Sequence, residues 1–225
     1  MLPQLFQQPL RKRKAPFDHP DWLFELKYDG FRAMAWIENR RCRMISRHGN
    51  HFSAFTELEK LIESGLSANN TVLDGEIVCV DGEGRPQFDD LMFRRGAPSF
   101  FAFDLLIRDG VDLRSAALVD RKQELRRVFA PVNTEVPIRY VDHIEGNGVP
   151  LFERVCALDL EGIVAKLKHG PYASTREAST WLKIKNREYS QMRGREELFE
   201  RKRHQEPVPG WHACDLACEE VEYAA

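Results

Sequence analysis

The sequence lacks any apolar run long enough to cross a membrane. A membrane-spanning helix needs roughly 18 or more consecutive apolar residues, whereas charged residues make up 30% of this chain and divide its apolar stretches into short segments. The basic run from Arg11 to Lys14 has no apolar segment of signal-peptide type beside it. We therefore expect a cytoplasmic protein that does not associate with membranes.

Cysteine is scarce and unsuited to a disulfide framework. The 225 residues include five cysteines, and an odd number without regular spacing argues against a disulfide scaffold. Near the C-terminus, His212, Cys214 and Cys218 match no standard zinc spacing, so we do not expect a metal site there. The other three lie in apolar or strand-like runs, where cysteine usually packs as a small hydrophobic residue: Cys42, Cys79 and Cys156.

The chain also lacks a strong net charge. Its formal net charge is −2, which neither requires nor excludes binding to nucleic acid. The basic residues are nevertheless concentrated in three segments, which are residues 11–14, 40–47 and 183–203. Such segments are often only solvated surface, but clustered Lys and Arg side chains are also what contacts phosphate groups.

Hydrophobic periodicity predicts an α+β fold, with antiparallel sheets and helices packed outside them. In the helix expected over 118–129, the Arg and Lys side chains should lie on the outer face. A polar, helical tail is expected from residue 188. The expected strands cover residues 22–26, 32–38, 41–47, 71–80, 99–107, 138–142, 162–167 and 180–185, and the expected helices cover 55–62, 118–129 and 149–160.

Five short segments carry residues suited to one kind of chemistry, and they occur in a fixed order. The first is KYDGFR at residues 27–32, which alone would be a weak signal. Because each of the others must also match independently, the ordered set is much more specific than any single member. The others are LDGE at 73–76, FD at 103–104, EGIVAK at 161–166 and WLKIK at 181–185.

This ordered set resembles the covalent nucleotidyltransferases, which include ATP-dependent DNA ligases, RNA ligases and mRNA capping enzymes. It looks most like the ligase domain of bacterial end-joining DNA ligases. The resemblance implies two twisted antiparallel sheets with flanking helices that form a nucleotide cleft. It suggests a basic N-terminal segment at 1–16, a nucleotidyltransferase domain at 17–187 and a charged helical tail at 188–225.

Lys27 is the candidate nucleophile. A protonated lysine is a poor nucleophile, so such a residue needs partial desolvation or nearby cations. Lys27 follows the apolar strand at 22–26 and precedes a turn, which places it at a strand end. Lys183 and Lys185 are the expected cationic neighbours. The resemblance implies that Lys27 attacks the α-phosphate of ATP and retains AMP through a phosphoramide bond.

Five other residues match nucleotide-binding positions of the resembled family. Glu25 matches the residue that reads the amino group of adenine, which favours ATP over GTP. Phe103 matches the aromatic residue that stacks on the base, with Ile163 or Val164 as the opposite wall. Glu76 can accept a hydrogen bond from a ribose hydroxyl, and the guanidinium groups of Arg32 and Arg47 suit phosphate or ribose oxygens.

Glu161 is the best candidate for a metal ligand, because a hard carboxylate suits Mg²⁺ or Mn²⁺ bridged to substrate phosphates. Asp29 is a second, outer contributor. Lys183 and Lys185 are two residues apart on an expected strand and therefore share one face. Together with Lys166, they would neutralise the α-phosphate during transfer.

The sequence departs from the resembled DNA ligases after Lys185, because most of them continue into an OB-fold domain. Only about 40 residues follow here, too few for a five-stranded OB barrel. We therefore expect no OB-fold domain in this sequence, and weak ligation from ATP compared with sealing of a nick that is already adenylated.

The leading functional hypothesis is an ATP-dependent DNA ligase that acts on nicked or broken double-stranded DNA. A separate OB-fold protein or end-joining partner is a further expectation. One alternative is an RNA ligase or a capping-type nucleotidyltransferase. Another is a module that binds nicks or ends without sealing them.

Overall fold

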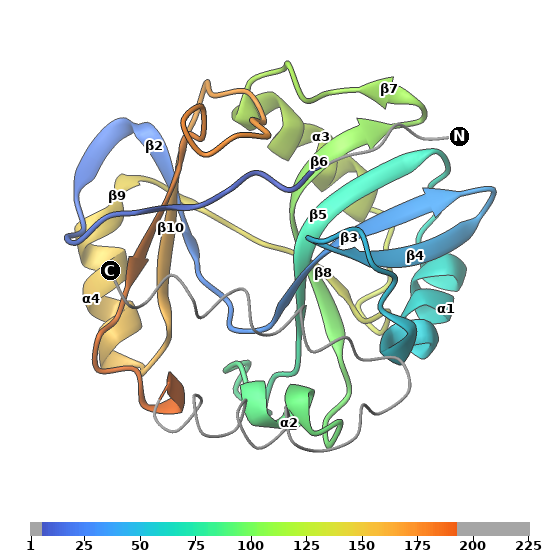
Figure 1. Cartoon of the computed structure of the whole chain (residues 1–225), viewed down its shortest axis with the longest axis horizontal. Helices are drawn as coiled ribbons and strands as arrows, with labels where there is room; N and C mark the ends of the chain where they lie inside the picture. Colours follow the sequence, from blue (N-terminus) through green and yellow to red (C-terminus); the bar gives the residue numbers. More distant parts are fainter. Residues whose placement is uncertain (1–5, 193–225) are drawn as a thin grey trace.

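Two β-sheets form the centre of the protein, as the computed structural model shows (Figure 1). The structure describes residues 6–192. The strand order of the first sheet is β1 (Arg11–Lys12), β11 (Trp181–Lys185), β10 (Gly162–Leu167), β2 (Asp18–Leu26) and β9 (Ile144–Asn147). The order of the second sheet is β4 (Arg41–Ser46), β3 (Phe31–Glu38), β5 (Thr71–Val78), β6 (Ser99–Arg108) and β7 (Val111–Asp112), with β8 (Ile138–Tyr140) beside β6.

The predicted α+β class with two sheets is confirmed. The expected all-antiparallel pairing needs one correction, since β1 pairs with β11 and β8 pairs with β6 in parallel. Both exceptions are short strands of two and three residues that add to the edge of a sheet or to an outer part of it. Neither sheet closes into a barrel within residues 6–192.

The chain passes from the first sheet to the second between β2 and β3, through residues 27–30. Gly30 is required there because of a close backbone approach. A Cβ atom at this position would lie 2.1 Å from the carbonyl oxygen of Ile77 in β5, which is too close for any side chain. Glycine thus allows β3 to begin directly against β5, with Lys27 at the end of β2.

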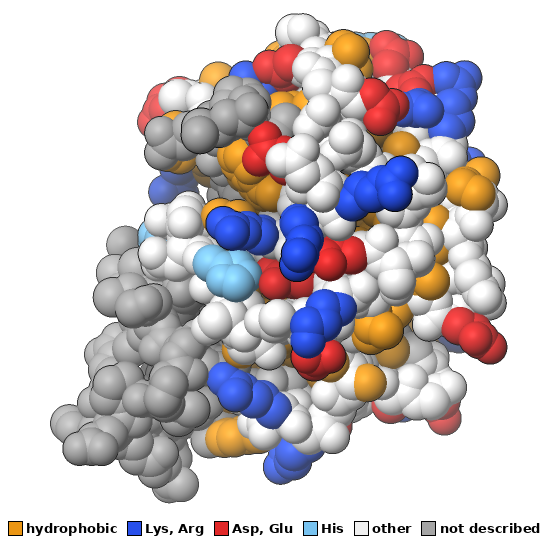
Figure 2. Space-filling view, turned by 90° about the vertical axis from the view of Figure 1, so that its right-hand side faces the viewer, with side chains coloured by type: hydrophobic (Ala, Val, Ile, Leu, Met, Phe, Trp, Pro, Cys, Tyr) orange, Lys and Arg blue, Asp and Glu red, His pale blue; other side chains and the backbone are white. Residues whose placement is uncertain are grey.

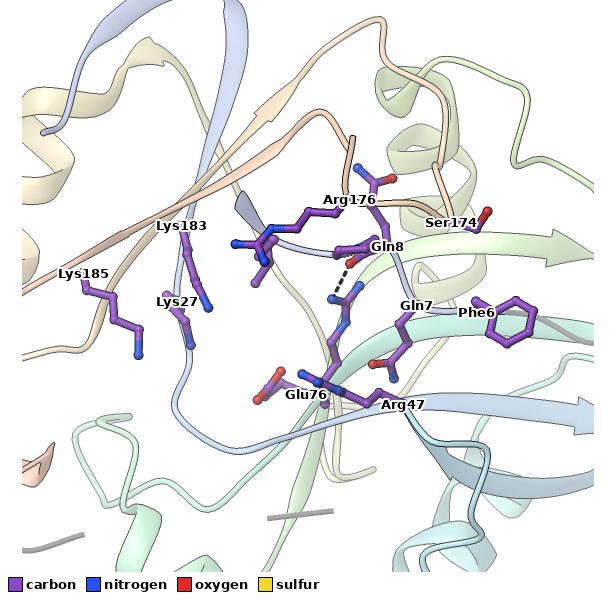
Figure 3. Close-up of a pocket in the computed structure, with 13 residues that line it drawn as sticks. Phe6, Gln7, Gln8, Lys27, Arg47, Glu76, Ser174, Arg176, Lys183 and Lys185 are labelled. Atoms are coloured by element: carbon purple, nitrogen blue, oxygen red, sulfur yellow. Dashed lines mark hydrogen bonds between the residues drawn. The ribbon is translucent and has the colours of Figure 1, made fainter. Parts of the chain in front are cut away.

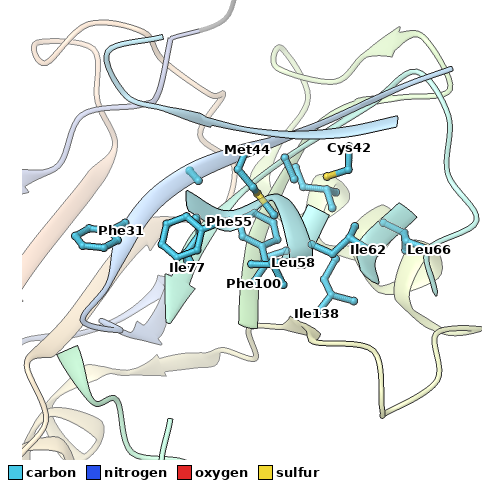
Figure 4. Packing of buried hydrophobic residues seen from close by; sticks show 14 of the residues in the cluster. Phe31, Cys42, Met44, Phe55, Leu58, Ile62, Leu66, Ile77, Phe100 and Ile138 are labelled. Carbon is cyan, nitrogen blue, oxygen red and sulfur yellow. The ribbon is translucent and has the colours of Figure 1, made fainter. Parts of the chain in front are cut away.

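Helices cover the outer faces of both sheets. The helices α1 (Thr56–Gly65) and α3 (Leu118–Phe129) pack on the second sheet, and α4 (Gly148–Ala157) packs on the first. Two short helices precede α1 and follow β5, namely η1 (Ser53–Phe55) and α2 (Phe88–Met92). The largest hydrophobic cluster lies between α1 and the second sheet, as Figure 4 shows.

A smaller apolar cluster joins the two sheets on their inner faces. Trp181 of β11 packs with Met34 of β3, Val72 of β5 and Leu106 of β6. Burial of a tryptophan with three large aliphatic side chains contributes several kcal/mol, at roughly 25 cal/mol per Å² of apolar surface. This cluster therefore holds the sheets together at one side of the cleft between them.

Most strands and helices predicted from the sequence are present, and the helix predicted over 118–129 has the same bounds as α3. Its Arg and Lys residues were expected on the outer face, and this was wrong for two of them. Arg121 is 0% exposed and Lys122 is 1% exposed, because each pairs with a buried carboxylate. The sequence did not predict the short elements β1, α2, β7 and β9.

The N-terminal part of the described chain also differs from expectation. Sequence analysis separated residues 1–16 from the domain, but Gln8 in that segment is completely buried and β1 extends the first sheet. Of the predicted helical tail, the structure describes only a short 3₁₀ turn, η2 (Ser190–Met192). The rest of the tail, with His212, Cys214 and Cys218, lies outside the described residues.

Three cysteines fall within the described residues, and none of the three forms a disulfide. Cys42 and Cys79 are buried, as expected for small hydrophobic residues, and Cys156 is partly exposed. None of the helices over residues 6–192 is both long enough and apolar enough to span a membrane.

Candidate active site

A cavity of about 340 Å³ lies between the two sheets, and most of the predicted site residues line it (Figure 3). Lys27, Lys183 and Lys185 come from the first sheet and point into the cavity from one side. Glu76 and Arg47 lie across from them on the second sheet. The cavity therefore collects residues that are far apart in the sequence.

Glu161 holds two of these lysines. Its Oε2 accepts a hydrogen bond from Lys27 Nζ at 2.7 Å, and its Oε1 lies 3.1 Å from Lys185 Nζ. Burial opposes ionisation of Glu161, but the positive charges of Lys27 and Lys185 outweigh it, so the pKa of its carboxyl is lowered. Burial also lowers the pKa of Lys185, and the neighbouring Lys27 adds to that effect while Glu161 opposes it.

The backbone fixes this group of side chains. The amide of Lys27 donates to the carbonyl of Gly162, and the amide of Asn186 donates to the carbonyl of Glu161. In the register of β10 and β11, Gly162 is opposite Lys185 and Val164 is opposite Lys183. Because β10 lies between β2 and β11, the ends of three neighbouring strands bring Lys27, Glu161 and Lys185 together.

A smaller cavity of about 40 Å³ adjoins the larger one and contains the residues expected to hold a base. Phe103, Val164 and Trp181 are among its lining residues, together with Glu25 and Lys166. Of the two residues considered for the wall opposite Phe103, Val164 lines this cavity. Trp181 was not expected there, although its position in a motif segment beside Lys183 could have indicated it.

Lys166 lines this smaller cavity, whereas Lys183 and Lys185, with which it is expected to neutralise the α-phosphate, line the larger one. Its Nζ is 2.6 Å from Glu25 Oε2 and 4.1 Å from the ring centroids of both Phe103 and Trp181. The difference arises from strand register, because Lys166 is opposite Trp181 on β11 and lies farther along β10 than Val164. Burial lowers the pKa of Lys166 to about 8, although Glu25 opposes this shift.

The carboxylate of Glu25 is held from two sides. Besides Lys166, it accepts a hydrogen bond from Lys122 of α3, whose Nζ lies 2.6 Å from Glu25 Oε1. The side chains of Glu25, Lys122 and Lys166 are each at most 2% exposed. Lys122 was missed by sequence analysis, since a lysine at a helical position next to another basic residue normally indicates a solvated face.

Arg32 is held by a buried network that sequence analysis did not predict. Its Nε and Nη2 donate to the two carboxylate oxygens of Asp74 at 3.1 and 2.7 Å, and its Nη1 donates to the carbonyl oxygen of Gln8 at 2.7 Å. Tyr172 donates its hydroxyl hydrogen to Asp74 and accepts one from the amide of Gln8. Asp74 lies within an apolar strand, and a carboxylate in such a strand needs a buried partner. This signal could have indicated the pairing of Asp74 with Arg32.

Asp29 is buried and lines neither cavity, and its Oδ2 accepts a hydrogen bond from the hydroxyl of Tyr189 at 2.9 Å. Across residues 6–192, no group of three or more His, Cys, Asp or Glu side chains is arranged to hold a metal ion. Any cation at this site would therefore depend on one or two carboxylates together with oxygen atoms of a substrate, as is usual for Mg²⁺.

Arg47 lines the main cavity and also a neighbouring groove of about 760 Å³ on β3 and β4. The outer face of β4 supplies Arg41 and Arg43 at alternate positions, and Arg47 and His48 follow the strand. Elsewhere the surface charge is mixed. Figure 2 shows basic and acidic side chains interspersed on one side of the molecule.

Two further segments contribute to the main cavity and were not expected to do so. Residues 6–10 line one side of it, and Ser174 and Arg176 reach it from the loop between β10 and β11. No sequence signal marked Arg176 beyond its position between two motif-bearing strands. Gln8 is fixed by hydrogen bonds to Ala173 and Ser179 of the same loop.

Comparison with known proteins identifies the family. The family model described as the ATP dependent DNA ligase domain matches residues 1–185. The multifunctional non-homologous end joining protein LigD of Pseudomonas aeruginosa is 34% identical over 171 residues, which are 73% of this chain and 20% of that protein. The prophage-derived DNA ligase-like protein LigB of Bacillus subtilis is 30% identical over 192 residues, which are 81% of this chain and 68% of that protein.

Solved structures agree with this result. The mycobacterial DNA ligase D complexed with ATP and MES has a TM-score of 0.68 and 26% identity, covering 80% of this chain and 60% of that one. The ligase domain of Mycobacterium tuberculosis LigD has a TM-score of 0.65 and the same identity. The fold and the cleft are thus those of a ligase nucleotidyltransferase domain. The chain belongs to the ATP-dependent DNA ligase family, and it spans about a fifth of the length of the Pseudomonas relative.

Proposed function

We propose that this chain catalyses the ATP-dependent joining of DNA and that Lys27 carries AMP as a covalent intermediate. The observation that supports this best is the arrangement of Lys27 beside Glu161 and Lys185 at the end of the cleft. A nucleophilic amine, a carboxylate and a second cation are the groups needed at the reacting phosphate. The family to which the chain belongs supports the same reaction.

In the proposed first step, Lys27 Nζ forms a bond to the α-phosphorus of ATP while the bond from that phosphorus to the pyrophosphate oxygen breaks. Pyrophosphate is the leaving group, and solvent water takes the proton that the lysine must lose before it attacks. Lys27 donates to Glu161 in the structure, an ion pair that favours the protonated and unreactive ammonium. Lys27 must therefore leave this pair, after which Lys185 remains as a partner for Glu161.

Glu161 is the proposed ligand for Mg²⁺ or Mn²⁺, with Asp29 as an outer contributor. A single buried carboxylate that faces the phosphate-binding lysines fits an ion that otherwise takes waters and phosphate oxygens. When bound, such an ion would neutralise charge on the α-phosphate and disfavour the protonated form of neighbouring lysines. Both oxygens of Glu161 contact lysines, and one oxygen of Asp29 accepts a hydrogen bond from Tyr189, so an ion bound by either carboxylate would replace one of these contacts.

The nucleotide roles follow from the two cavities. We assign the base to the smaller cavity, between Phe103 and Val164, with Glu25 facing the amino group of adenine. Glu76 lines both cavities and suits a ribose hydroxyl. Four other predicted residues that line the larger cavity are cations and therefore suit phosphates: Arg32, Arg47, Lys183 and Lys185. Lys166 is assigned to the base end, since its ammonium faces Glu25.

Nicked or broken double-stranded DNA is the proposed second substrate. The groove beside the main cavity carries Arg41, Arg43 and Arg47 on and just after β4, which suits the phosphates of a nucleic acid backbone. Several relatives are named as end-joining proteins, which supports an end-joining partner or a separate OB-fold protein as collaborators. A site of action in the cytoplasm is part of the same proposal.

The direct test is covalent labelling with α-³²P-ATP and Mg²⁺, followed by denaturing electrophoresis. We expect labelling of the wild-type chain and none of the Lys27→Ala variant, because Lys27 is the amine that lies beside Glu161 at the end of β2. Lys14→Ala is the matched control, since Lys14 is an exposed lysine that does not line the cavity. It should label at the wild-type rate.

Labelling of Lys27→Ala at the wild-type rate would contradict the proposal. The same assay separates the alternatives. Labelling by GTP in preference to ATP would indicate a capping-type enzyme, and sealing of nicked RNA in preference to DNA would indicate an RNA ligase. A chain that binds nicked DNA but accepts no nucleotide would be a binding module.

A further inference from the structure

Two hydrogen bonds and one aromatic contact fix the position of the Lys122 ammonium. It extends from α3 toward β2, where its Nζ donates to Glu25 Oε1 at 2.6 Å and to the carbonyl oxygen of Val141 at 2.7 Å. The same ammonium lies 4.6 Å from the centroid of the Tyr140 ring. Burying an ammonium is costly unless its donors are engaged, and here two hydrogen bonds and one aromatic face engage them.

Lys122 stands behind Glu25 relative to the smaller cavity. Glu25 and Lys166 line that cavity, whereas Lys122 is not among its lining residues. The two lysines take opposite oxygens of the carboxylate, since Lys122 contacts Oε1 and Lys166 contacts Oε2. Glu25 is thus held in one orientation at the edge of the cavity, with a positive charge on each side.

This arrangement determines which hydrogen bonds Glu25 can make with a base. An ionised carboxylate has no donor and offers about four acceptor positions. The two lysines use one position on each oxygen, and the others remain for a ligand. A 6-amino purine presents a donor to such a group, whereas a 6-oxo purine presents an acceptor and would be rejected.

We propose that Lys122 is a positioning residue that sets the preference of this cleft for 6-amino over 6-oxo purine nucleotides. It acts by holding the Glu25 carboxylate in one orientation through the hydrogen bond to Oε1, without touching the nucleotide. The inference rests on the function proposed above, because it assumes that the base enters the smaller cavity. It goes further in assigning the selectivity to a residue of α3 outside the five motif segments.

The test compares ATP with ITP, which carry an amino group and an oxo group respectively at purine position 6, in the covalent labelling reaction. Loss of a hydrogen bond to a charged group costs about 1.5–3 kcal/mol, or about ten- to a hundredfold in affinity. Lys122→Met should therefore raise the ATP concentration for half-maximal labelling about ten- to a hundredfold, with little change in the maximum rate. The preference for ATP over ITP should narrow by a similar factor. Lys122→Arg, which keeps the charge and the hydrogen-bond donors, should retain most of the wild-type preference for ATP over ITP.

Arg121→Met is the matched control. Arg121 neighbours Lys122 on α3, is equally buried and pairs with Asp104 instead of Glu25. Its replacement should lower stability without changing the ratio of ATP to ITP. If Lys122→Met folds and keeps the wild-type ratio, or if Arg121→Met narrows the ratio as much, the proposal is wrong.

A double variant covers the case in which Lys122→Met does not fold. Glu25→Gln combined with Lys122→Met leaves no unpaired carboxylate, and it should show the same ATP-to-ITP ratio as Glu25→Gln alone, because both changes act through one group. A ratio that differs between the two would overturn the proposal. Failure of the proposed ligase function can be distinguished from failure of this inference, because the wild-type chain would then be labelled by neither ATP nor ITP. In that case protection against thermal unfolding by ATP and by ITP, in the wild-type chain and Lys122→Met, decides the inference.

Discussion

Several charged side chains at the cleft are buried or half-buried and are held by groups of opposite charge. Glu161 pairs with Lys27 and Lys185, Glu25 with Lys122 and Lys166, and Asp74 with Arg32. Breaking one such pair leaves an uncompensated buried charge, which is far more costly than breaking a pair on the surface. Substitutions at these residues should therefore be interpreted with a measurement of stability beside the measurement of activity.

Lys166 gives a prediction about pH. Burial lowers its pKa from 10.5 to about 8 in the folded protein. Between these two pH values the unfolded chain retains a proton on Lys166 that the folded protein has released, so folding becomes more favourable as the pH rises. Relative to Lys166→Met, which has no such group, the wild-type free energy of unfolding should increase from pH 8 to pH 10.

The measurement is urea unfolding of both proteins without nucleotide at pH 7.5, 8.5 and 10. Lys14→Met is the control, because Lys14 is exposed, and its difference from wild type should stay constant across this range. A constant difference for Lys166→Met as well would show that Lys166 keeps an ordinary pKa in the folded state.

At the scale of elements, the connection between β2 and β3 constrains the sequence at Gly30. Gly30→Ala should destabilise the fold by about 1–3 kcal/mol, as overpacking typically does, because the added methyl group meets the Ile77 carbonyl at 2.1 Å and Glu76 Cγ at 3.1 Å. The control is Gly82→Ala, where a Cβ atom meets nothing within 4 Å. Urea unfolding measures both, and equal stability of the two variants would refute the role given to Gly30.

Much of the fold could be predicted because the strands alternate and the helices are amphipathic. The bounds of α3 and β10 coincide with those expected, and the segment after Leu26 was expected to turn where the chain crosses between the sheets. The pairing of strands that are far apart in the sequence could not be predicted. The two-residue strand β1 has no pattern of its own and exists because β11 offers a free edge.

In the candidate site, too, local sequence patterns were predictable and long-range contacts were not. Motif residues such as Lys27, Glu76 and Lys183 lie at one cavity, and their order in the chain was enough to group them. The positions of Lys122 and Lys166 could not be predicted, because each depends on where Glu25 lies in three dimensions. Local patterns place a lysine on a face of a helix or strand, but only the packing of several elements decides whether a buried carboxylate lies opposite.

For the whole molecule, the groove on β3 and β4 predicts how DNA binding should depend on salt. Replacing both Arg41 and Arg43 with alanine should weaken binding to a nicked duplex. It should also reduce the slope of log affinity against log salt by up to about 0.9 for each phosphate that the variant no longer neutralises. Fluorescence anisotropy at several salt concentrations measures both quantities.

Arg126 and Arg127 provide a matched pair for comparison, since they are exposed on α3 and do not line the groove. Their double alanine variant should keep the wild-type slope. If the Arg41 and Arg43 variant also keeps it, the groove does not contact the DNA backbone.

The assignment of cleft residues to separate sheets has a mechanical consequence. Lys27, Glu161 and Lys185 lie in or beside strands of the first sheet, and Arg32, Arg47 and Glu76 lie in or beside strands of the second. A nucleotide that contacts residues of both sheets would fix the spacing between the sheets. If Lys27 carries AMP as proposed above, the bonded AMP would lie where the chain passes from the first sheet to the second. A change in the spacing between the sheets would then also move the bonded AMP. The same movement that admits DNA to the cleft would therefore bring the AMP group toward the DNA end that accepts it.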